Sequence, residues 1–422
     1  MMARYPPGFD LGLSRISALL ALLDDPHRRL PPTIHVAGTN GKGSTIAFMR
    51  AMLEASGRSV HVHTSPHLVR WHERFRVAGH LVSDPALHDA LTRVDAVLQD
   101  EQEGTRGVTV FEIMTAVAFL LFSETPADAL LLEVGLGGEF DATNVIERPA
   151  ACVIAPIALD HQAHLGNTIG EIAGAKAGII KRGAPVVSAA QHDDAREVIE
   201  AVAGRHGTSV IFADQDFQGF PERGGMIFQD TSGLMDLPSP ALLGEHQFDN
   251  AALAIASLKA ASFELSVEQV SEGLRSVVWP GRMQRMPEGE LNKLIPGHEV
   301  WLDGGHNPHG AEAVASVLDA RGATDTALVC GMLNTKDPEG YFRALSKVVS
   351  GVITVPITSS NAGVPAGDLA ATARSAGLKA HDADSLTDAL QQLTGNSNQP
   401  VLIGGSLYLV GDALAQNGTP PV

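Results

Sequence analysis

The chain has 422 residues, of which 44% are hydrophobic and 18% are charged. This length predicts two or three domains, and the composition excludes an intrinsically disordered protein because large cores can form. The formal net charge is −18, with 30 Lys and Arg against 48 Asp and Glu. Duplex DNA and anionic membranes both require basic surfaces, so neither is expected as the main partner. An anionic substrate would therefore need a local cluster of donors.

The two cysteines, Cys152 and Cys330, lie far apart in separate apolar runs. This arrangement is typical of reduced, buried thiols in a cytosolic protein. The N-terminal stretch MMARYPPGFD contains no apolar signal core, and no run approaches the ~18 apolar residues of a membrane span. We expect a cytoplasmic monomer that acts on small molecules, with no nucleic-acid or membrane partner.

Short apolar runs alternate with helical patterns along the first part of the chain. In chain order, we expect a buried strand at 34–38, a helix at 44–57, strands at 127–135 and 151–157, a helix at 168–181 and a strand at 184–189. Such alternation predicts an α/β fold with a parallel, doubly wound sheet.

The rhythm changes twice in the rest of the chain. Short Gly- and Pro-containing strands at 208–240 predict a small antiparallel insert. Proline and glycine at 277–289 indicate a linker, after which the α/β alternation restarts. We therefore predict two domains, 1–280 and 281–422.

The segment GTNGKGS, residues 38–44, predicts a phosphate-binding loop between a buried strand and a helix. Its glycines allow the backbone to approach phosphate oxygens closely, and Lys42 supplies a positive charge. The usual pattern places Ser or Thr directly after the lysine, whereas Gly43 stands there in this chain. The alternative is a tight strand-to-helix turn with an incidental lysine. We expect nucleotide contacts from the residues Thr39, Asn40, Gly41, Lys42, Gly43 and Ser44.

Glu133 lies near the end of the strand predicted at 127–135, beside the phosphate loop. A carboxylate at this place suits Mg²⁺, which usually takes one or two carboxylates together with phosphate and water. The following GLGG lacks the third glycine of a dinucleotide-binding fingerprint. The histidines of 61–72 lack Cys or Glu ligands at the spacing of a zinc site.

The loop GTNGKGS resembles that of the Mur-ligase superfamily, ATP-dependent enzymes that join a carboxylate to an amino acid. The glycine after the lysine resembles the folylpolyglutamate synthase and dihydrofolate synthase branch. Further segments resemble this branch in the same order, including FDLGLSRI (9–16), SPHL (65–68), FEIMTAVAF (111–119), LEVGLGGEFDATN (132–144), LDH (159–161), KAG (176–178), GEHQFDNA (244–251), WPGR (279–282) and LDGGHNPHG (302–310). The resemblance implies a P-loop Mur-ligase-type ATPase domain with a parallel central sheet and a smaller Rossmann-like C-terminal domain.

The resemblance also implies roles for particular residues. It assigns one Mg²⁺ to Ser65 and Glu133, and a second to His161 and Lys176, the latter as a carbamate. It implies catalytic roles for Lys42, His161, Lys176 and Arg282. Nucleotide contacts are expected from Asn250, Arg282, Asp303 and His306. Contacts with the pterin or folate are expected from Asp10, Leu11, Gly12, Phe111, Thr115, Asp141 and Ala142.

The implied reaction joins L-glutamate to dihydropteroate, or to the γ-carboxylate of reduced folates, through an acyl phosphate formed with ATP. The first domain would hold ATP and the pterin or folate, and the second the glutamate. Alternatives are another amino-acid ligase of the superfamily and a catalytically silent ATP-binding protein. Glu139-Phe140 and Ala175 depart from the family pattern, which has Arg-Leu and Glu there. Which of the two ligations occurs is left open.

Overall fold

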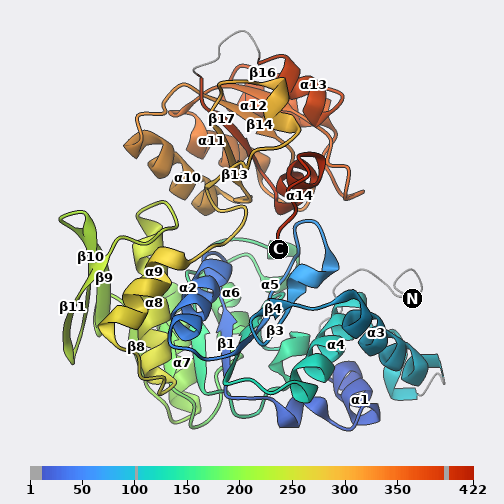
Figure 1. Cartoon of the computed structure of the whole chain (residues 1–422), viewed down its shortest axis with the longest axis vertical. Helices are drawn as coiled ribbons and strands as arrows, with labels where there is room; N and C mark the ends of the chain where they lie inside the picture. The colour runs from blue at the N-terminus through green and yellow to red at the C-terminus, as the bar shows by residue number, and fades with distance from the viewer. Residues whose placement is uncertain (1–11, 100–102, 394–398) are drawn as a thin grey trace. The chain divides into compact units, whose positions relative to one another are not determined.

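The computed structural model describes residues 12–99, 103–393 and 399–422 (Figure 1). Asp10 and Leu11 lie outside the described residues. The chain divides into two compact units. The first contains the described residues of Met1–Ser65, Trp71–Pro240 and Phe248–Val277, and the second contains Pro66–Arg70, Ala241–Gln247 and Val278–Val422.

The first unit is built on an eight-stranded sheet with the order β4-β3-β2-β5-β1-β6-β7-β8. Strands β2 and β5 to β8 are parallel to β1, whereas β3 and β4 extend the sheet in an antiparallel manner. The strands are β1 Thr33–Ala37, β2 Val60–His63, β3 Phe75–Val77, β4 His80–Leu81, β5 Ala129–Glu133, β6 Ala151–Ile154, β7 Val186–Ser188 and β8 Val210–Phe212. Since β1 lies between β5 and β6, the loops that leave the carboxyl ends of these three strands are neighbours.

Helices flank this sheet (Figure 1). They are α1 Ser14–Leu22, α2 Lys42–Ala55, α3 Asp84–Gln99, α4 Val110–Glu124, α5 Gln162–Leu165, α6 Ile169–Ala177, α7 Asp193–Arg205, α8 His246–Ala260 and α9 Val267–Ser276. Capping boxes precede α4 at Thr109 and α6 at Thr168. In each, the threonine side chain accepts from the N–H of the Glu three residues later, and the carboxylate of that Glu accepts from the threonine N–H. The strands and helices expected between 34 and 189 are therefore confirmed, with ends that differ by a few residues.

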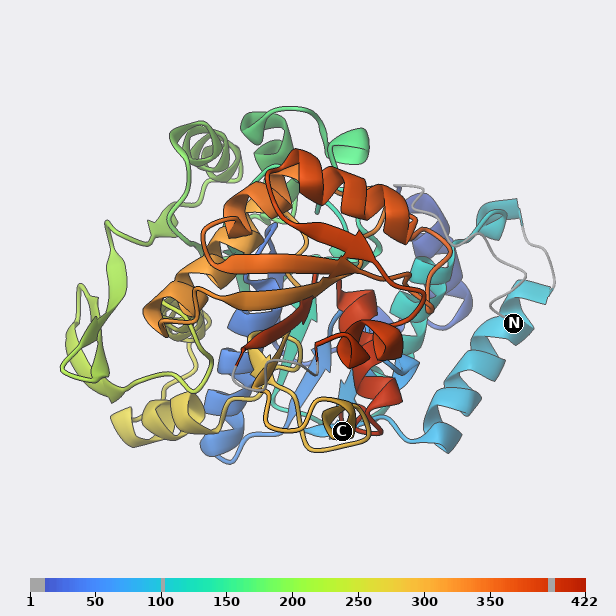
Figure 2. The same ribbon diagram turned by 90° about the horizontal axis from the view of Figure 1, so that it is seen from above.

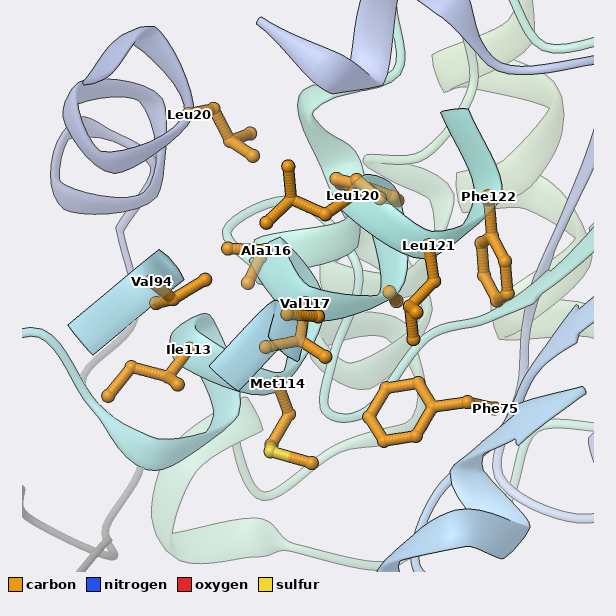
Figure 3. Packing of buried hydrophobic residues seen from close by; sticks show 14 of the residues in the cluster. Leu20, Phe75, Val94, Ile113, Met114, Ala116, Val117, Leu120, Leu121 and Phe122 are labelled. Carbon is orange, nitrogen blue, oxygen red and sulfur yellow. The ribbon is translucent and has the colours of Figure 1, made fainter. Parts of the chain in front are cut away.

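The helix α4 is fixed by a core that gathers side chains from several elements. Figure 3 shows Ile113, Val117 and Leu121 of α4 packed with Val94 of α3 and Phe75 of β3. Their burial removes apolar surface from water and stabilises the position of α4. This helix also carries Phe111 and Thr115, two of the predicted substrate residues.

The predicted antiparallel insert is confirmed, although it is shorter than expected. Strands β9 Phe217–Glu222, β10 Gly225–Asp230 and β11 Gly233–Pro238 form a separate three-stranded antiparallel sheet. The preceding strand β8, which lies within the predicted range, instead pairs in parallel with β7 of the main sheet. Sequence pattern alone does not reveal which partner such a short strand chooses, because pairing depends on distant residues.

The second unit contains a six-stranded sheet with the order β12-β13-β17-β14-β15-β16, parallel except for β12. Figure 2 shows its strands with helices on both sides. Its elements are β12 Gln284–Arg285, β13 Val300–Asp303, α10 Pro308–Ala320, β14 Thr326–Cys330, α11 Pro338–Leu345, β15 Val349–Thr354, α12 Ala366–Ser375, β16 Ala380–Asp382, α13 Leu386–Gln391, β17 Val401–Gly404 and α14 Leu407–Gln416.

Neighbouring residues of these strands belong to two different cores. Leu328 and Leu402 pack in one core, whereas Val329 and Ile403 pack in the other. Because side chains alternate across a strand, helices cover both faces of this parallel sheet. The predicted α/β fold with a smaller α/β C-terminal part is therefore confirmed. Among the described residues, no helix is long and apolar enough to cross a membrane.

Candidate active site

Two glycines shape the loop between β1 and α2. At Gly38, an added Cβ would lie 2.7 Å from the Ala155 side chain. At Gly41, where φ is +81°, it would lie 2.5 Å from the Asn250 Oδ1. Both places therefore require glycine, and Asn250 of α8 packs directly on the loop. Gly41 immediately precedes α2. The N-terminus of this helix therefore follows a tight glycine turn, as expected for a phosphate loop.

The same loop is fastened to the segment that follows β6. The N–H groups of Thr39 and Asn40 donate to the Pro156 carbonyl at 2.9 and 3.2 Å. The Thr39 hydroxyl donates to the Ala158 carbonyl, and the Ala158 N–H donates to that hydroxyl oxygen, each at 3.1 Å. Gly43 and the buried Ser44 lie in the first turn of α2. These bonds hold the phosphate loop close to the segment that leads to His161.

Three candidate residues meet beside this loop. Lys42 Nζ donates to the Gly38 carbonyl at 3.1 Å and lies 3.8 Å from Glu133 Oε1. The other Glu133 oxygen accepts a bond of 3.1 Å from the backbone N–H of Ser65. Glu133 is only 5% exposed, so its negative charge is compensated by these neighbours. The structure thus brings together Lys42, Glu133 and Ser65, from three different segments of the chain.

Lys176 also reaches the phosphate loop. It lies on α6, is buried, and its Nζ donates to the Gly38 carbonyl at 2.9 Å, the same oxygen that accepts from Lys42. His161 lies at the start of α5 with φ of +53°, and its N–H donates to Asp160 Oδ1 at 2.7 Å. This left-handed backbone is uncommon for a residue other than glycine and is typical of functional sites.

Among the described residues, no three His, Cys, Asp or Glu side chains are grouped so that they could hold a metal. Each predicted Mg²⁺ site contains one such side chain, Glu133 or His161, together with Ser65 or Lys176. Water, phosphate or a carbamate would have to supply the remaining oxygen ligands of each ion. Such a site suits a nucleotide-bound Mg²⁺ rather than a closed structural site.

Asp141 is buried and bonded to its own loop. It is 2% exposed, and its Oδ2 accepts from the Leu136 N–H at 2.8 Å. Its Oδ1 accepts from the N–H and hydroxyl of Thr143. Burial raises the pKa of this carboxyl, whereas these bonds oppose the shift. Both oxygens accept bonds from the chain itself, so Asp141 organises this loop, and its contact with the pterin amine stays a prediction.

The other predicted substrate residues lie around the beginning of α4. The Phe111 ring occupies the space beside Gly135, where an added Cβ would lie 2.4 Å from the ring. Thr115 is buried and its hydroxyl donates to the Phe111 carbonyl at 2.9 Å. Ala142 is buried in the turn after Asp141, and Gly12 is half-buried shortly before α1. Among the described side chains of this set, that of Phe111 is partly exposed, whereas those of Thr115, Asp141 and Ala142 are buried.

The structure adds a connection that sequence reasoning missed. Arg15 of α1 forms an ion pair of 3.2 Å with the buried Glu112 of α4. This pair joins the described end of the segment FDLGLSRI to the segment FEIMT. The charged residue inside each apolar segment was the available signal, because buried charges are usually paired.

The loop that departs from the family pattern packs against the end of α6. A Cβ at Gly138 would lie 2.8 Å from the carbonyl oxygens of both Ala175 and Lys176. The Glu139 N–H donates to the Ala175 carbonyl at 2.8 Å. The Glu139 side chain is exposed, as is Phe140 at 49%. Glu139-Phe140 therefore faces solvent, and the backbone beneath it contacts the end of the helix that carries Lys176.

The candidates of the second unit lie around the end of β13. Asp303 accepts from the N–H of Gly305 at 2.7 Å and from that of Met283 at 2.8 Å. Arg282 Nη1 donates to the Gly281 carbonyl, and His306 Nδ1 lies 2.9 Å from the Gly304 carbonyl. The buried Asp303 thus orders the two loops that carry Arg282 and His306.

Two family descriptions match the chain. The Mur ligase middle domain matches residues 36–258. The C-terminal domain of dihydrofolate synthetase matches residues 296–416.

Several characterised relatives extend over nearly the whole chain. The dihydrofolate synthase/folylpolyglutamate synthase of Bacillus subtilis is 35% identical over 96% of this chain and 94% of its own. The protein of the same name from Mycobacterium tuberculosis is 37% identical over 91% of this chain and 82% of its own.

Solved structures agree with these relatives. A Mycobacterium tuberculosis folylpolyglutamate synthase complexed with ADP and AMPPCP matches with a TM-score of 0.88 and 32% identity, over 100% of this chain and 97% of that chain. The Escherichia coli enzyme in complex with DHPP and ADP matches with a TM-score of 0.86 and 30% identity, over 96% and 93%. A bifunctional synthase with Mn, AMPPNP and L-glutamate bound matches with a TM-score of 0.84 and 31% identity, over 97% and 95%. This chain therefore belongs to the dihydrofolate synthase/folylpolyglutamate synthase family of Mur ligases.

Proposed function

We propose that this chain is an ATP-dependent ligase that joins L-glutamate to dihydropteroate and to the γ-carboxylate of reduced folates. The observation that carries this proposal is the meeting of Lys42, Glu133, Ser65 and Lys176 at a glycine-rich phosphate loop, in a member of this family. A silent ATP-binding protein would not need a second lysine, Lys176 of α6, that donates to the same carbonyl of the phosphate loop as Lys42. Another ligase of the superfamily is opposed by the relatives that span most of the chain.

The proposed reaction begins with activation of the acceptor carboxylate. A carboxylate oxygen attacks the γ-phosphorus of ATP, the bond to the bridging oxygen breaks, and ADP leaves. The α-amine of glutamate then attacks the acyl carbon, phosphate departs with the former carboxylate oxygen, and the nitrogen loses a proton. The protein contributes mainly position and charge neutralisation. Lys42 is the residue placed to offset negative charge beside the loop.

The metal sites are part of the proposal. Ser65 and Glu133 would hold one Mg²⁺, and His161 with carbamylated Lys176 would hold the second. When bound, the ions supply positive charge that lowers the repulsion between the phosphates and the acceptor carboxylate. The relative with bound Mn and AMPPNP supports a divalent metal beside the nucleotide. Glu133 is ready for this role because it already lies between Lys42 and Ser65.

Carbamylation of Lys176 has a physical reason in this site. The ammonium groups of Lys42 and Lys176 share one carbonyl oxygen, and like charges at this separation repel. Addition of CO₂ to the Lys176 amine would replace this repulsion with attraction. Intact-protein mass spectrometry in bicarbonate buffer should detect one added CO₂, and Lys176→Gln should abolish it. The same mass in both proteins would contradict the assignment.

The remaining site residues follow the same proposal. Asn250, Arg282, Asp303 and His306 would serve the nucleotide, with Asp303 acting through the loops that it orders. Phe111 and the segment around Gly12 would serve the pterin or folate. The first predicted domain would then hold ATP and acceptor, and the second would hold glutamate. We further propose that the enzyme is a cytoplasmic monomer.

The decisive assay measures ADP release from ATP, Mg²⁺ and L-glutamate with dihydropteroate and, separately, tetrahydrofolate as acceptor. Mass spectrometry of the product then counts the glutamates added. We expect stimulation by both acceptors. Stimulation by one alone would restrict the activity to that ligation, and stimulation by neither would overturn the proposed function.

A further inference from the structure

We propose that His35 is a positioning residue that holds the loop 134–144 through the hydroxyl of Thr143. The inference deepens the proposed function, on which its substrate assay rests. This contact lies outside the phosphate loop. It is made by His35 in the middle of β1, the strand that leads into the loop.

The contact is a short buried chain of hydrogen bonds. His35 is fully buried in β1, and its neighbours across the sheet are Leu132 of β5 and Cys152 of β6. Its Nε2 lies 2.8 Å from the Thr143 hydroxyl oxygen. That oxygen lies 2.5 Å from Asp141 Oδ1. These hydrogen bonds therefore connect His35 with Thr143 and Asp141, which both lie far from it in the sequence.

The directions of these bonds follow from the donors available. Both Asp141 oxygens accept backbone N–H groups, Oδ1 from Thr143 and Oδ2 from Leu136. A hydroxyl has one proton, and that of Thr143 is donated to Asp141. The Thr143 oxygen must then accept from His35 Nε2–H. Nε2 therefore carries a proton, and Nδ1 of this buried ring has no hydrogen-bond partner among the described residues, which favours the neutral form protonated on Nε2 alone.

Electrostatics agree with this tautomer. Burial, together with the positive charge of Lys181, lowers the pKa of His35 to about 3. The ring therefore acts as a permanent donor at neutral pH. A donor of this kind can fix a neighbouring loop without changing its charge.

The loop 134–144 contacts residues proposed for the acceptor and residues proposed for the metal ions. It begins directly after Glu133, and its Gly135 lies against the Phe111 ring. Its Gly138 packs on the carbonyl of Lys176. The phosphate loop is fastened independently through Pro156. Loss of the His35 bond should therefore disturb the acceptor side more than the nucleotide side.

The substrate test compares matched pairs of variants. His35→Leu removes the donor, whereas His35→Gln retains an N–H donor of similar reach. Thr143→Val removes the hydroxyl, whereas Thr143→Ser retains it. We expect the donor-free variants to raise the KM for dihydropteroate or tetrahydrofolate about tenfold, which corresponds to about 1.4 kcal/mol. The KM for ATP should change less than about twofold, equivalent to about 0.4 kcal/mol, and the conservative variants should remain near wild type.

Equal increases in both KM values, or no difference between Thr143→Val and Thr143→Ser, would overturn the proposal. If His35→Leu does not fold, the Thr143 pair still decides. A structural role alone would lower stability without separating the two KM values.

A second readout does not depend on activity. Long-range ¹H–¹⁵N spectra of the ¹⁵N-histidine protein should contain a neutral Nε2–H ring at pH 7 that disappears in His35→Gln and shifts in Thr143→Val. A ring protonated on Nδ1, or on both nitrogens, would refute the inference. If wild-type protein ligates neither acceptor, the proposed function fails, and this spectrum still decides whether the His35 contact exists.

Discussion

The buried neutral imidazole of His35 should make the first unit sensitive to mild acid. The folded pKa is about 3, whereas the ordinary value is 6.5. Between these two values the unfolded chain binds a proton that the folded chain does not. The folded pKa is depressed, so the stability is fully present above pH 6.5 and is lost as the pH falls toward 3.

The magnitude follows from proton linkage. One such group changes the free energy of unfolding by about 1.4 kcal/mol per pH unit. Between pH 6.5 and pH 5 the loss is about 2 kcal/mol. His35→Gln cannot bind this proton. The destabilisation caused by His35→Gln, relative to wild type, should therefore be about 2 kcal/mol smaller at pH 5 than at pH 7.

The assay is hydrogen exchange in increasing urea, followed by mass spectrometry of peptides that cover β1, with correction for the intrinsic pH dependence of exchange. The β1 peptides report the first unit alone. His88→Gln provides a control because His88 is exposed on α3. It reports how the replacement of an exposed histidine on the same unit changes the measurement at each pH. The same effect of His35→Gln at pH 7 and pH 5 would refute a buried neutral imidazole.

Three further changes test individual contacts. Lys42→Ala should lower kcat for ADP release at least about 100-fold because the charge beside the phosphates is lost, whereas near-normal ADP release would contradict its assignment. Gly41→Ala should raise the Kd for ATP at least about tenfold in calorimetry, because its Cβ would meet Asn250. The control is Gly57→Ala, which has a similar φ of +82° but open space around it and should leave the Kd for ATP unchanged. Asn417→Ala should destabilise the second unit by about 1–3 kcal/mol in urea unfolding, because its amide bonds the Leu291 N–H and the Pro287 carbonyl; unchanged stability would show that these bonds contribute nothing.

The parts of the fold set by local pattern could be predicted from sequence. The strand at 34–38, its glycine turn and the helix that follows all lie within a few residues of β1 and α2. Parallel pairing followed from the alternation of strands and helices. The choice of β7 as partner for β8 could not be predicted, because it depends on residues distant in sequence.

The site shows the same division. Spacing and resemblance named Lys42 and Glu133, which the structure brings within 3.8 Å of each other. Asp141 is predicted to contact the substrate, and the sequence did not reveal that its carboxylate also accepts bonds from Leu136 and Thr143. His35 looked like an ordinary residue of a buried strand. Its contact with Thr143 joins residues 108 positions apart, and no local pattern reports such a bond.

The most direct test of the proposed reaction follows one oxygen atom. Dihydropteroate labelled with ¹⁸O in its carboxylate is incubated with the protein, ATP, Mg²⁺ and L-glutamate, and the released phosphate is analysed by mass spectrometry. An acyl phosphate requires that one ¹⁸O pass from the carboxylate to phosphate as the amide forms. Phosphate carrying one ¹⁸O, in amounts equal to the ligated product, is the predicted result. Ligated product accompanied by unlabelled phosphate, or phosphate released without product, would contradict the account.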